Sequence, residues 1–561
     1  MSVIFTHFLR IWQRKPTPRH CMYVWRLGDS GACDWRQAMI SKKLTSSTVD
    51  RSLVVALAFL MVITTGCSSS ESEPTATTAV ATTATTAAAT TTAAVPETTT
   101  ATRPPSSLVW EPCGQAECAT FTVPLDHDDP LRGTIDLAVA RRPAQRPEER
   151  IGVLLYNPGG PGVPGTPWVL DSAGFLFSQK LLDRFDVVSW DPRGVSEAAA
   201  VDCVDNPELF LHDPTPETAE EAALIDAAVD GFVAGCVERS GDLLPYLSTM
   251  SSARDMDLLR AALGEEQISY LGLSYGTALG STYATLFPDR VRVMVLDSAF
   301  DLSAPLADWI VPRAEAQEGA LNLALEQCAA DSACPFHNDG DPFTAFDELM
   351  VRLDAEPLMV DDTEVGLGHA TQALFEGLMF EEHPVGPDWS KLMRALAEAQ
   401  EGNGRLLRDL ASGLNEIVES LLAIECLDWP SGSSPSQATI DAVLAVAPRL
   451  GPFQVEGPEP CSVWPAEPDP PPPLTGADAG PILVIVNTGD IATPLESSRD
   501  LADHLEEGVL LIVQRNSHGA YWIGPDNLCI TETVDRYLTD LELPTNESRC
   551  IPGDPQLHPP S

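Results

Sequence analysis

Basic residues are scarce in this chain, and lysine is almost absent from its larger part. The 561 residues include 34 Lys and Arg against 81 Asp and Glu, which gives a formal net charge of −47. After Cys67 only two lysines occur, Lys180 and Lys391. A surface of this charge repels phosphate groups, which argues against nucleic acid or anionic lipid as a partner. We interpret the surplus of acidic residues as an adaptation for solubility or high salt. The charge is compatible with small or cationic substrates.

Cysteine motifs of the metal-binding type are absent, since no CxxC or HxxxC cluster occurs among the 13 cysteines. A disulfide framework is the better interpretation, and it indicates an oxidising compartment. With Cys21, Cys33 and Cys67 set aside, the remaining cysteines fall into successive couples. We expect neighbour pairing, although sequence alone cannot fix connectivity. The couples are Cys113 with Cys118, Cys203 with Cys236, Cys328 with Cys334, Cys426 with Cys461, and Cys529 with Cys550.

The apolar run that ends at Ile63 is too short for a comfortable membrane span. Basic residues precede this run and Thr-Thr-Gly-Cys67 follows it, which is the layout of a secretory signal with a cleavage site. Residues 39–67 resemble a bacterial lipoprotein signal, in which Cys67 becomes the lipid-carrying first residue, although Thr64 departs from the usual aliphatic residue. We expect an extracellular, cell-surface protein that meets the membrane only through this lipid.

Composition divides the rest of the chain into segments. Residues 1–38 look unlike any signal, so we expect a non-native extension ahead of the true start. Residues 68–106 are almost entirely Thr, Ala, Ser and Pro. Such a stretch has too few large apolar groups to offset the entropy of ordering, and it predicts a disordered tether. A first core segment is predicted over 107–300, a helical lid with its return segment over 301–475, and a C-terminal core segment over 476–555.

Short β-branched runs separated by helical stretches predict an α/β fold with a mostly parallel sheet flanked by helices. Between Leu296 and Ile482 no comparable run occurs, and apolar residues recur there at helical spacing, as at 314–329 and 389–401. A helical lid inserted into the sheet domain accounts for this order. The predicted strands are Gly152 to Tyr156, Phe185 to Trp190, Ile268 to Leu273, Val291 to Leu296, Ile482 to Val486 and Val509 to Val513.

The strongest motif is Gly272-Leu273-Ser274-Tyr275-Gly276, directly after a predicted strand and before a helix-like segment. A serine on so tight a turn needs small neighbours, and the turn exposes its hydroxyl beside the helix N-terminus. This context predicts Ser274 as the nucleophile of an α/β-hydrolase. The oxyanion site of such an enzyme draws on the loop after an earlier strand, here the glycine-rich segment 157–162. We assign the amides of Gly160 and Tyr275 as its donors.

The acid and the base should follow the serine in the order Asp, His, each just beyond a strand. Asp490 and His518 each follow a predicted strand of the C-terminal core segment. His518 is therefore the predicted general base, and Asp490 is the acid that orients it. Asp500 and Asp540 are weaker candidates for the acid, because neither comes directly after a strand. This chemistry needs no metal and no organic cofactor.

Several segments of the chain form a characteristic set: Asn157 to Gly162, Trp190 to Gly194, the Ser274 turn, Ala423 to Asp428, Asp490 to Pro494, and His518-Gly519. Together they resemble the tripeptidyl aminopeptidase branch of the proline iminopeptidase-like α/β-hydrolases, over roughly Trp110 to Leu538. Proline iminopeptidases usually have His where Asn157 stands. The tripeptidyl branch also lacks this His, so Asn157 argues against an enzyme that releases single prolines.

The resemblance implies a secreted serine exopeptidase that removes short peptides from free N-termini, with an acidic group in or near the lid receiving the α-ammonium. Glu425 and Asp428 lie where the lid rejoins the core, and either could be that group or a purely structural one. Asp191 and Arg193 are expected to form a structural ion pair.

Two alternatives come from other classes, because fold does not settle function. One is a carboxylesterase acting on lipid or small-molecule esters, and the other is a non-catalytic surface binding protein. The intact set Ser274, Asp490 and His518 argues against the second. A requirement for a free amine in the substrate would separate the peptidase from the esterase, and the oligomeric state stays open.

Overall fold

The computed structural model describes residues 108–205, 211–379, 389–413, 417–429, 435–455, 459–521 and 527–560. The predicted signal with Cys67 and the predicted tether lie outside the described residues. Among the helices of the described part, none is both long enough and apolar enough to cross a membrane.

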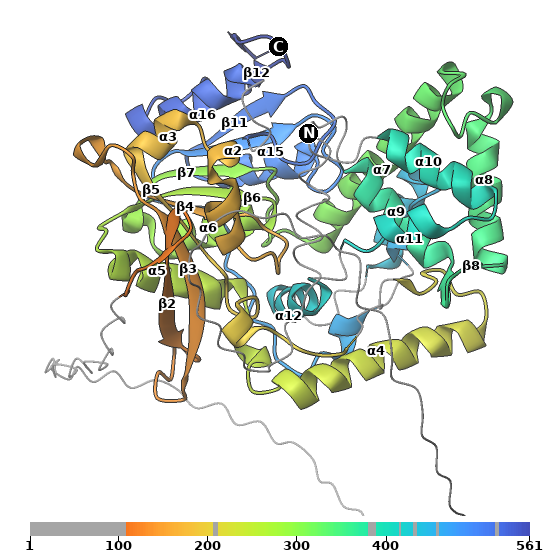
Figure 1. Cartoon of the computed structure of the whole chain (residues 1–561), viewed down its shortest axis with the longest axis horizontal. Coiled ribbons are helices and arrows are strands. Elements are labelled where there is room, and N and C mark those ends of the chain that lie inside the picture. Colours follow the sequence, from red (N-terminus) through yellow and green to blue (C-terminus); the bar gives the residue numbers. More distant parts are fainter. Residues whose placement is uncertain are drawn as a thin grey trace, which may run out of the picture. The chain divides into compact units, whose positions relative to one another are not determined.

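The described chain contains an 11-stranded sheet, most of which is seen on the left in Figure 1. Its strand order is β1-β2-β3-β5-β4-β6-β7-β10-β11-β12-β13. The run from β5 to β12 is parallel throughout, and the outer pairs are antiparallel. The strands are β1 Glu111–Cys113, β2 Ala116–Pro124, β3 Thr134–Arg142, β4 Gly152–Asn157, β5 Phe185–Trp190, β6 Ile268–Leu273, β7 Val291–Asp297, β10 Ile482–Asn487, β11 Gly508–Val513, β12 Ser548–Cys550 and β13 Leu557–His558.

The six predicted strands correspond to β4, β5, β6, β7, β10 and β11, so the prediction of a mostly parallel sheet is confirmed. These strands are buried on both faces, because alternate side chains enter two different hydrophobic clusters. Leu155 and Val484 belong to one cluster, and Leu154 and Leu483 belong to the other. A strand buried on both sides reads as a continuous apolar run, which is why the sequence revealed it.

The sequence analysis missed the antiparallel strands at the two ends of the sheet. β2 and β3 alternate between buried and partly exposed positions, with Phe121 and Leu137 buried between polar neighbours. Alternation of this kind is typical of strands with one solvated face, and it lacks the continuous apolar signal of the central strands.

Helices cover the sheet, and a second set of helices follows β7. The helices of the sheet domain are α2 Ala173–Leu176, α3 Gln179–Arg184, α5 Thr249–Leu263, α6 Tyr275–Leu286, α15 Leu495–His504 and α16 Leu528–Asp540, together with α4 Ala219–Ser240, which lies farther from the strands in Figure 1 and contacts the 3-10 turn Pro460–Val463. Those between β7 and β10 are α7 Leu306–Ala330, α8 Pro342–Ala355, α9 Leu367–Leu378, α10 Trp389–Gln400, α11 Arg405–Leu410, α12 Val418–Asp428, α13 Gln437–Val446 and α14 Pro452–Val455, with a small hairpin of β8 Leu358–Val360 and β9 Thr363–Val365.

The inserted helices have a hydrophobic core of their own. Leu321, Phe346, Leu374 and Leu396, from four different helices, are buried in one cluster that is separate from the clusters on the sheet. In Figure 1, α8, α9, α10 and α11 gather beside one another, away from the strands. We call this set, from α7 to α14, the lid.

Five disulfides join the cysteines of the described chain, each to its neighbour in the sequence. One of them connects α12, a lid helix whose apolar side chains belong to a cluster on the sheet, to the 3-10 turn Pro460–Val463. The pairs are Cys113–Cys118, Cys203–Cys236, Cys328–Cys334, Cys426–Cys461 and Cys529–Cys550.

The expected ion pair between Asp191 and Arg193 is wrong. Arg193 is fully buried, and its Nε and Nη2 donate to the two carboxylate oxygens of Asp255 at 2.7 Å each. Asp191 instead accepts hydrogen bonds from the amide (2.8 Å) and hydroxyl (3.1 Å) of Thr166. The two side chains leave the turn after β5 in different directions, and Arg193 reaches α5, which carries Asp255.

Candidate active site

Ser274 stands on the tight turn between β6 and α6. Its backbone has φ 57° and ψ −127°, a conformation that is costly for a residue with a side chain. The Ser274 amide donates to the carbonyl oxygen of Asp297 at 2.9 Å, which ties the turn to the end of β7. Ser274 is partly exposed while the residues on both sides of it are buried. The fold thus presents this one hydroxyl at the carboxyl edge of the parallel strands.

The two glycines of the motif are required by close backbone approach. A Cβ at Gly272 would collide with the carbonyl oxygen of Gly276. A Cβ at Gly276 would lie 2.6 Å from the carbonyl oxygen of Asn157. Small flanking residues are therefore a steric condition of the turn, as the motif predicted.

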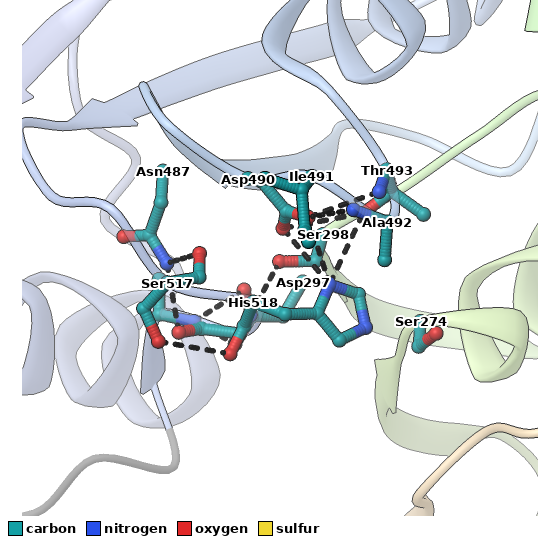
Figure 2. A network of polar contacts seen from close by, with 12 residues as sticks. Ser274, Asp297, Ser298, Asn487, Asp490, Ile491, Ala492, Thr493, Ser517 and His518 are labelled. Carbon is teal, nitrogen blue, oxygen red and sulfur yellow. Dashed lines mark hydrogen bonds and ion pairs between the residues drawn. The ribbon is translucent and has the colours of Figure 1, made fainter. Parts of the chain in front are cut away.

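His518 and Asp490 come together from the loops after β11 and β10. The Nδ1 atom of His518 lies 3.0 and 2.9 Å from the two carboxylate oxygens of Asp490. Asp490 also accepts hydrogen bonds from the amides of Ala492 (3.0 Å) and Thr493 (2.9 Å). Figure 2 shows the other ring nitrogen, Nε2, pointing toward Ser274. The structure thus brings together the three residues that the sequence analysis assigned to the triad.

The surroundings of His518 favour its protonated form. Burial by itself would lower the pKa of His518, but the charge of Asp490, its hydrogen bond and the nearby charge of Asp297 outweigh burial and raise the pKa above the ordinary value. The positive charge of Arg313 acts in the opposite direction. An imidazole whose protonated form is stabilised, and whose ring is held in place by a buried acid, can accept the serine proton and later give it back.

Three polar residues that the sequence analysis did not single out hold the His518 loop (Figure 2). Asn487 donates from Nδ2 to the carbonyl oxygens of Ser517 and Gly519, at 2.8 Å each. Ser298 Oγ accepts from the amide of Gly519 at 2.8 Å. Asp297 accepts from the two amides that follow, and burial raises its pKa to about 6.

A sequence signal for two of these residues existed. Asp297 and Asn487 are the last residues of β7 and β10, polar groups at the ends of apolar strands. The lid also reaches this loop, since the amide of His518 donates to the carbonyl oxygen of Met379, directly after α9, at 2.9 Å.

The glycine-rich loop after β4 packs against the nucleophile turn. A Cβ at Gly159 would lie 3.0 Å from the Cβ of Ser274 and 3.1 Å from the amide nitrogen of Tyr275. Gly160, the predicted donor, is the next residue and has φ 110°. Tyr275 is the first residue of α6, so its amide has no acceptor within the helix. Both predicted oxyanion donors therefore belong to segments that meet at Ser274.

The two acids at the end of α12 differ in their surroundings. Asp428 is buried, and its carboxylate accepts hydrogen bonds from the amide (2.8 Å) and hydroxyl (2.6 Å) of Thr249. Glu425 is partly exposed, and within the described residues no hydrogen bond or ion pair to its carboxylate occurs. Burial raises the pKa of Glu425 to about 7 against the opposing charge of Arg313, and the pKa of Asp428 to about 8.

The charges of both acids act on the side chain of Tyr275, the residue after the nucleophile. Burial raises the pKa of the Tyr275 phenol, and the negative charges of Asp428 and then Glu425 raise it further. Tyr275 directly follows Ser274. Asp428 is thus satisfied within the fold, whereas Glu425 offers a carboxylate that the described chain leaves open.

Comparison with known proteins agrees with this arrangement. Residues 152–340 match the family described as alpha/beta hydrolase fold, and residues 445–550 match the family described as TAP-like protein. The chain is 32% identical over 479 residues to serine protease Hip1 of Mycobacterium tuberculosis, covering 79% of this chain and 90% of the relative. It is 32% identical over 483 residues to tripeptidyl aminopeptidase of Streptomyces coelicolor, covering 79% and 86%.

A third relative carries a different activity in its name. Carboxylesterase B of Mycobacterium tuberculosis is also 32% identical, over 461 residues, covering 78% of this chain and 86% of the relative. All three alignments span most of both chains, and the protein is an enzyme of the serine hydrolase class. The chain belongs to the tripeptidyl aminopeptidase-like family of α/β-hydrolases, the branch that its sequence motifs resemble.

Proposed function

We propose that this enzyme is a secreted serine exopeptidase that releases short peptides from free N-termini. The observation that carries the proposal is Glu425, a partly exposed lid carboxylate close to Tyr275, the residue after the nucleophile, to which no described residue donates a hydrogen bond. An acid in this position suits the α-ammonium of a peptide. The relatives named serine protease and tripeptidyl aminopeptidase support a peptide substrate.

The reaction is acyl transfer. His518 takes the Ser274 proton on Nε2 as the serine oxygen attacks the carbonyl carbon, and Asp490 fixes the imidazole tautomer. The amides of Tyr275 and Gly160 hold the oxyanion of the tetrahedral intermediate. The imidazolium then protonates the leaving amine, and water releases the acyl group by the same route.

Glu425 selects substrates through charge. A protonated amine beside it forms a charge-assisted hydrogen bond in a partly desolvated setting. Acetylation of the amine removes the charge and leaves the carboxylate facing an amide. The loss of such a buried interaction costs about 1–3 kcal/mol, or about fivefold to 150-fold in kcat/KM.

Replacement of Glu425 with glutamine is expected to erode the preference for free over acetylated peptide amides by about tenfold to a hundredfold. The ratio of the two kcat/KM values is the measurement, and hydrolysis of a small neutral ester by the same preparation serves as the internal reference. An unchanged ratio in Glu425→Gln would show that the amine is received elsewhere.

Asp428→Asn is the matched control on the same helix. Because Asp428 is bonded to Thr249, this change should lower the melting temperature more than the free-amine preference. If Asp428→Asn instead removes the preference and Glu425→Gln does not, the roles of the two acids are exchanged.

A carboxylesterase is the second candidate, because Carboxylesterase B is as similar in sequence as the peptidases are. The same triad hydrolyses esters and amides, so the machinery does not separate the two. Equal rates on free and blocked peptides, with faster cleavage of esters, would favour it.

Export to an oxidising compartment is part of the proposal, and the five disulfides support it. The mature chain is expected to begin at Cys67 with added lipid mass and to partition with membranes. Intact-mass analysis of the protein from its native host checks this. A soluble mature chain that starts elsewhere and carries no lipid would refute the anchor while leaving secretion intact.

A further inference from the structure

Arg313, on the first lid helix α7, is held by aromatic rings. Its guanidinium carbon lies 4.7 Å from the ring centre of Trp309 and 5.2 Å from that of Phe375 on α9. The residue is partly exposed, while its Nε atom is buried without a hydrogen-bond partner. Stacking between two rings fixes the direction of the planar group and leaves its edge free to bind.

Among the described residues no hydrogen bond or ion pair to the Arg313 guanidinium occurs, and its Nε atom is buried. Burial lowers the pKa of Arg313, and the negative charge of Glu425, which lies close enough to act on it without bonding it, opposes that effect. The lack of a bonded acid among the described residues is unexpected in a chain with 81 acids against 34 bases. Two arginines of known environment differ from Arg313: Arg193 bonds Asp255, and Arg408 on α11 bonds Asp361 at 3.3 Å. A guanidinium stays charged in proteins, and a buried charge without a partner is costly. Arg313 therefore fits a site that an anion completes.

The charge of Arg313 acts on both the triad and the proposed ammonium site. Its charge opposes protonation of His518, and it also opposes the effect of burial on Glu425. The Trp309 ring continues into an aromatic wall, 5.9 Å from the ring of Trp429, which directly follows α12. These partly exposed rings reduce water around the two charges and strengthen their interactions with a ligand.

The presence of Arg313 changes what Glu425 can bind well. Glu425 attracts a plain ammonium, but the nearby guanidinium of Arg313 repels it. Since Glu425 and Arg313 together carry no net charge, a plain ammonium gains little from the two residues. A group that carries both an ammonium and a carboxylate satisfies both residues at once. In a peptide with a free N-terminus these two charges are adjacent when the first residue is Asp or Glu.

We propose that Arg313 binds the side-chain carboxylate of the substrate's N-terminal residue while Glu425 binds its α-ammonium, so that the preferred substrates begin with Asp or Glu. The inference rests on the proposed exopeptidase function and names the substrate class of that site. Arg313 is thus a specificity residue: it contacts the side chain of the substrate's first residue and takes no part in proton transfer.

The test compares tripeptide amides of a fluorogenic amine that differ only in the first residue, Glu, Gln, Ala or Lys, with the full-length enzyme. A charged hydrogen bond of about 1.5 kcal/mol predicts that Glu exceeds Gln by about tenfold in kcat/KM, with Lys the poorest. Because these substrates have no free C-terminus, the side chain is their only carboxylate. A separate arm uses peptides with a free C-terminal carboxylate and a neutral first residue, and a gain there instead would assign Arg313 to the substrate C-terminus and overturn the proposal.

Arg313→Gln is expected to remove the Glu-over-Gln ratio, and Arg313→Lys to keep part of it, because lysine retains the charge without the planar fork. Arg408→Gln is the matched control, a lid arginine that already has an acidic partner, and it should keep the ratio. Persistence of the ratio in Arg313→Gln, or equal rates for Glu and Gln with the unaltered enzyme, would refute the inference. The comparison of the Glu and Gln substrates needs only the unaltered enzyme, so it remains decisive even if the variants fold poorly. Failure of the exopeptidase function itself looks different, since free and acetylated peptides would then be cleaved equally whatever their first residue.

Discussion

Replacement of Ser274 with alanine is expected to lower kcat by roughly 10⁴- to 10⁶-fold for peptide and ester substrates alike. Ser274 supplies the oxygen that forms the acyl-enzyme, and no neighbouring group can take its place on a turn this constrained. The oxyanion amides and the substrate contacts remain, so a small residual rate over the uncatalysed reaction is expected. Folding should be preserved, because the side chain is partly exposed and small.

Labelling with a fluorophosphonate checks this result independently of substrate choice. The label should disappear in Ser274→Ala and remain in Ser281→Ala, a matched control on the helix that follows, whose hydroxyl bonds the carbonyls of Thr277 at 2.8 Å and Ala278 at 3.2 Å. Thermal melting of both variants shows whether the fold is intact. Labelling that survives in Ser274→Ala would mean that another serine is the nucleophile.

Replacement of Asp490 with asparagine is expected to lower kcat by about 10⁴-fold while leaving substrate affinity nearly unchanged. The carboxylate accepts the Nδ1 proton of His518 and so leaves Nε2 free to receive the serine proton. An asparagine at this place can present its amide group to Nδ1, which favours the wrong tautomer. The effect on kcat should thus be far greater than the loss of one ordinary hydrogen bond.

The pH profile gives a second measure of the same change. His518 acts as a base only when neutral, so the rate rises as pH increases through the pKa of His518. Asp490 raises this pKa, and the rising limb should therefore move to lower pH in Asp490→Asn. Asp297, which also raises the pKa of His518, remains in place, so part of the elevation should persist in the variant.

Asp500→Asn and Asp540→Asn are the controls for this assignment. Asp500 lies on α15 and lines a small hollow with His504, and Asp540 ends α16 with Lys180 at 2.9 Å. Neither variant should change kcat by more than a few fold. A large loss in one of them, with little loss in Asp490→Asn, would transfer the role of the acid.

The central strands and the order of the site residues could be predicted from sequence for a physical reason. Strands buried on both faces must be apolar throughout, so β4, β6 and β10 stand out as short continuous runs. The residue after each run then lies at one edge of the sheet, because the strands are parallel. Ser274, Asp490 and His518 are far apart in the chain, yet each comes just after such a run.

Residues whose partners come from distant segments could not be predicted in this way. Arg193 was expected to pair with Asp191, two positions away, but it reaches Asp255 on α5. Chain proximity is a poor guide at a turn, where successive side chains point in different directions. The edge strands β2 and β3 were missed because one solvated face makes their sequence alternate.

The sequence by itself determined the fold class, the central strands, the nucleophile turn and the loops that hold Asp490 and His518. It left Glu425 and Asp428 equivalent, since both are acids three residues apart on one helix. Only the tertiary structure separated them, by placing Thr249 against Asp428 and leaving Glu425 open beside Arg313. Whether a charge is satisfied depends on which groups packing brings within a few ångströms of it, and local sequence carries no record of those groups.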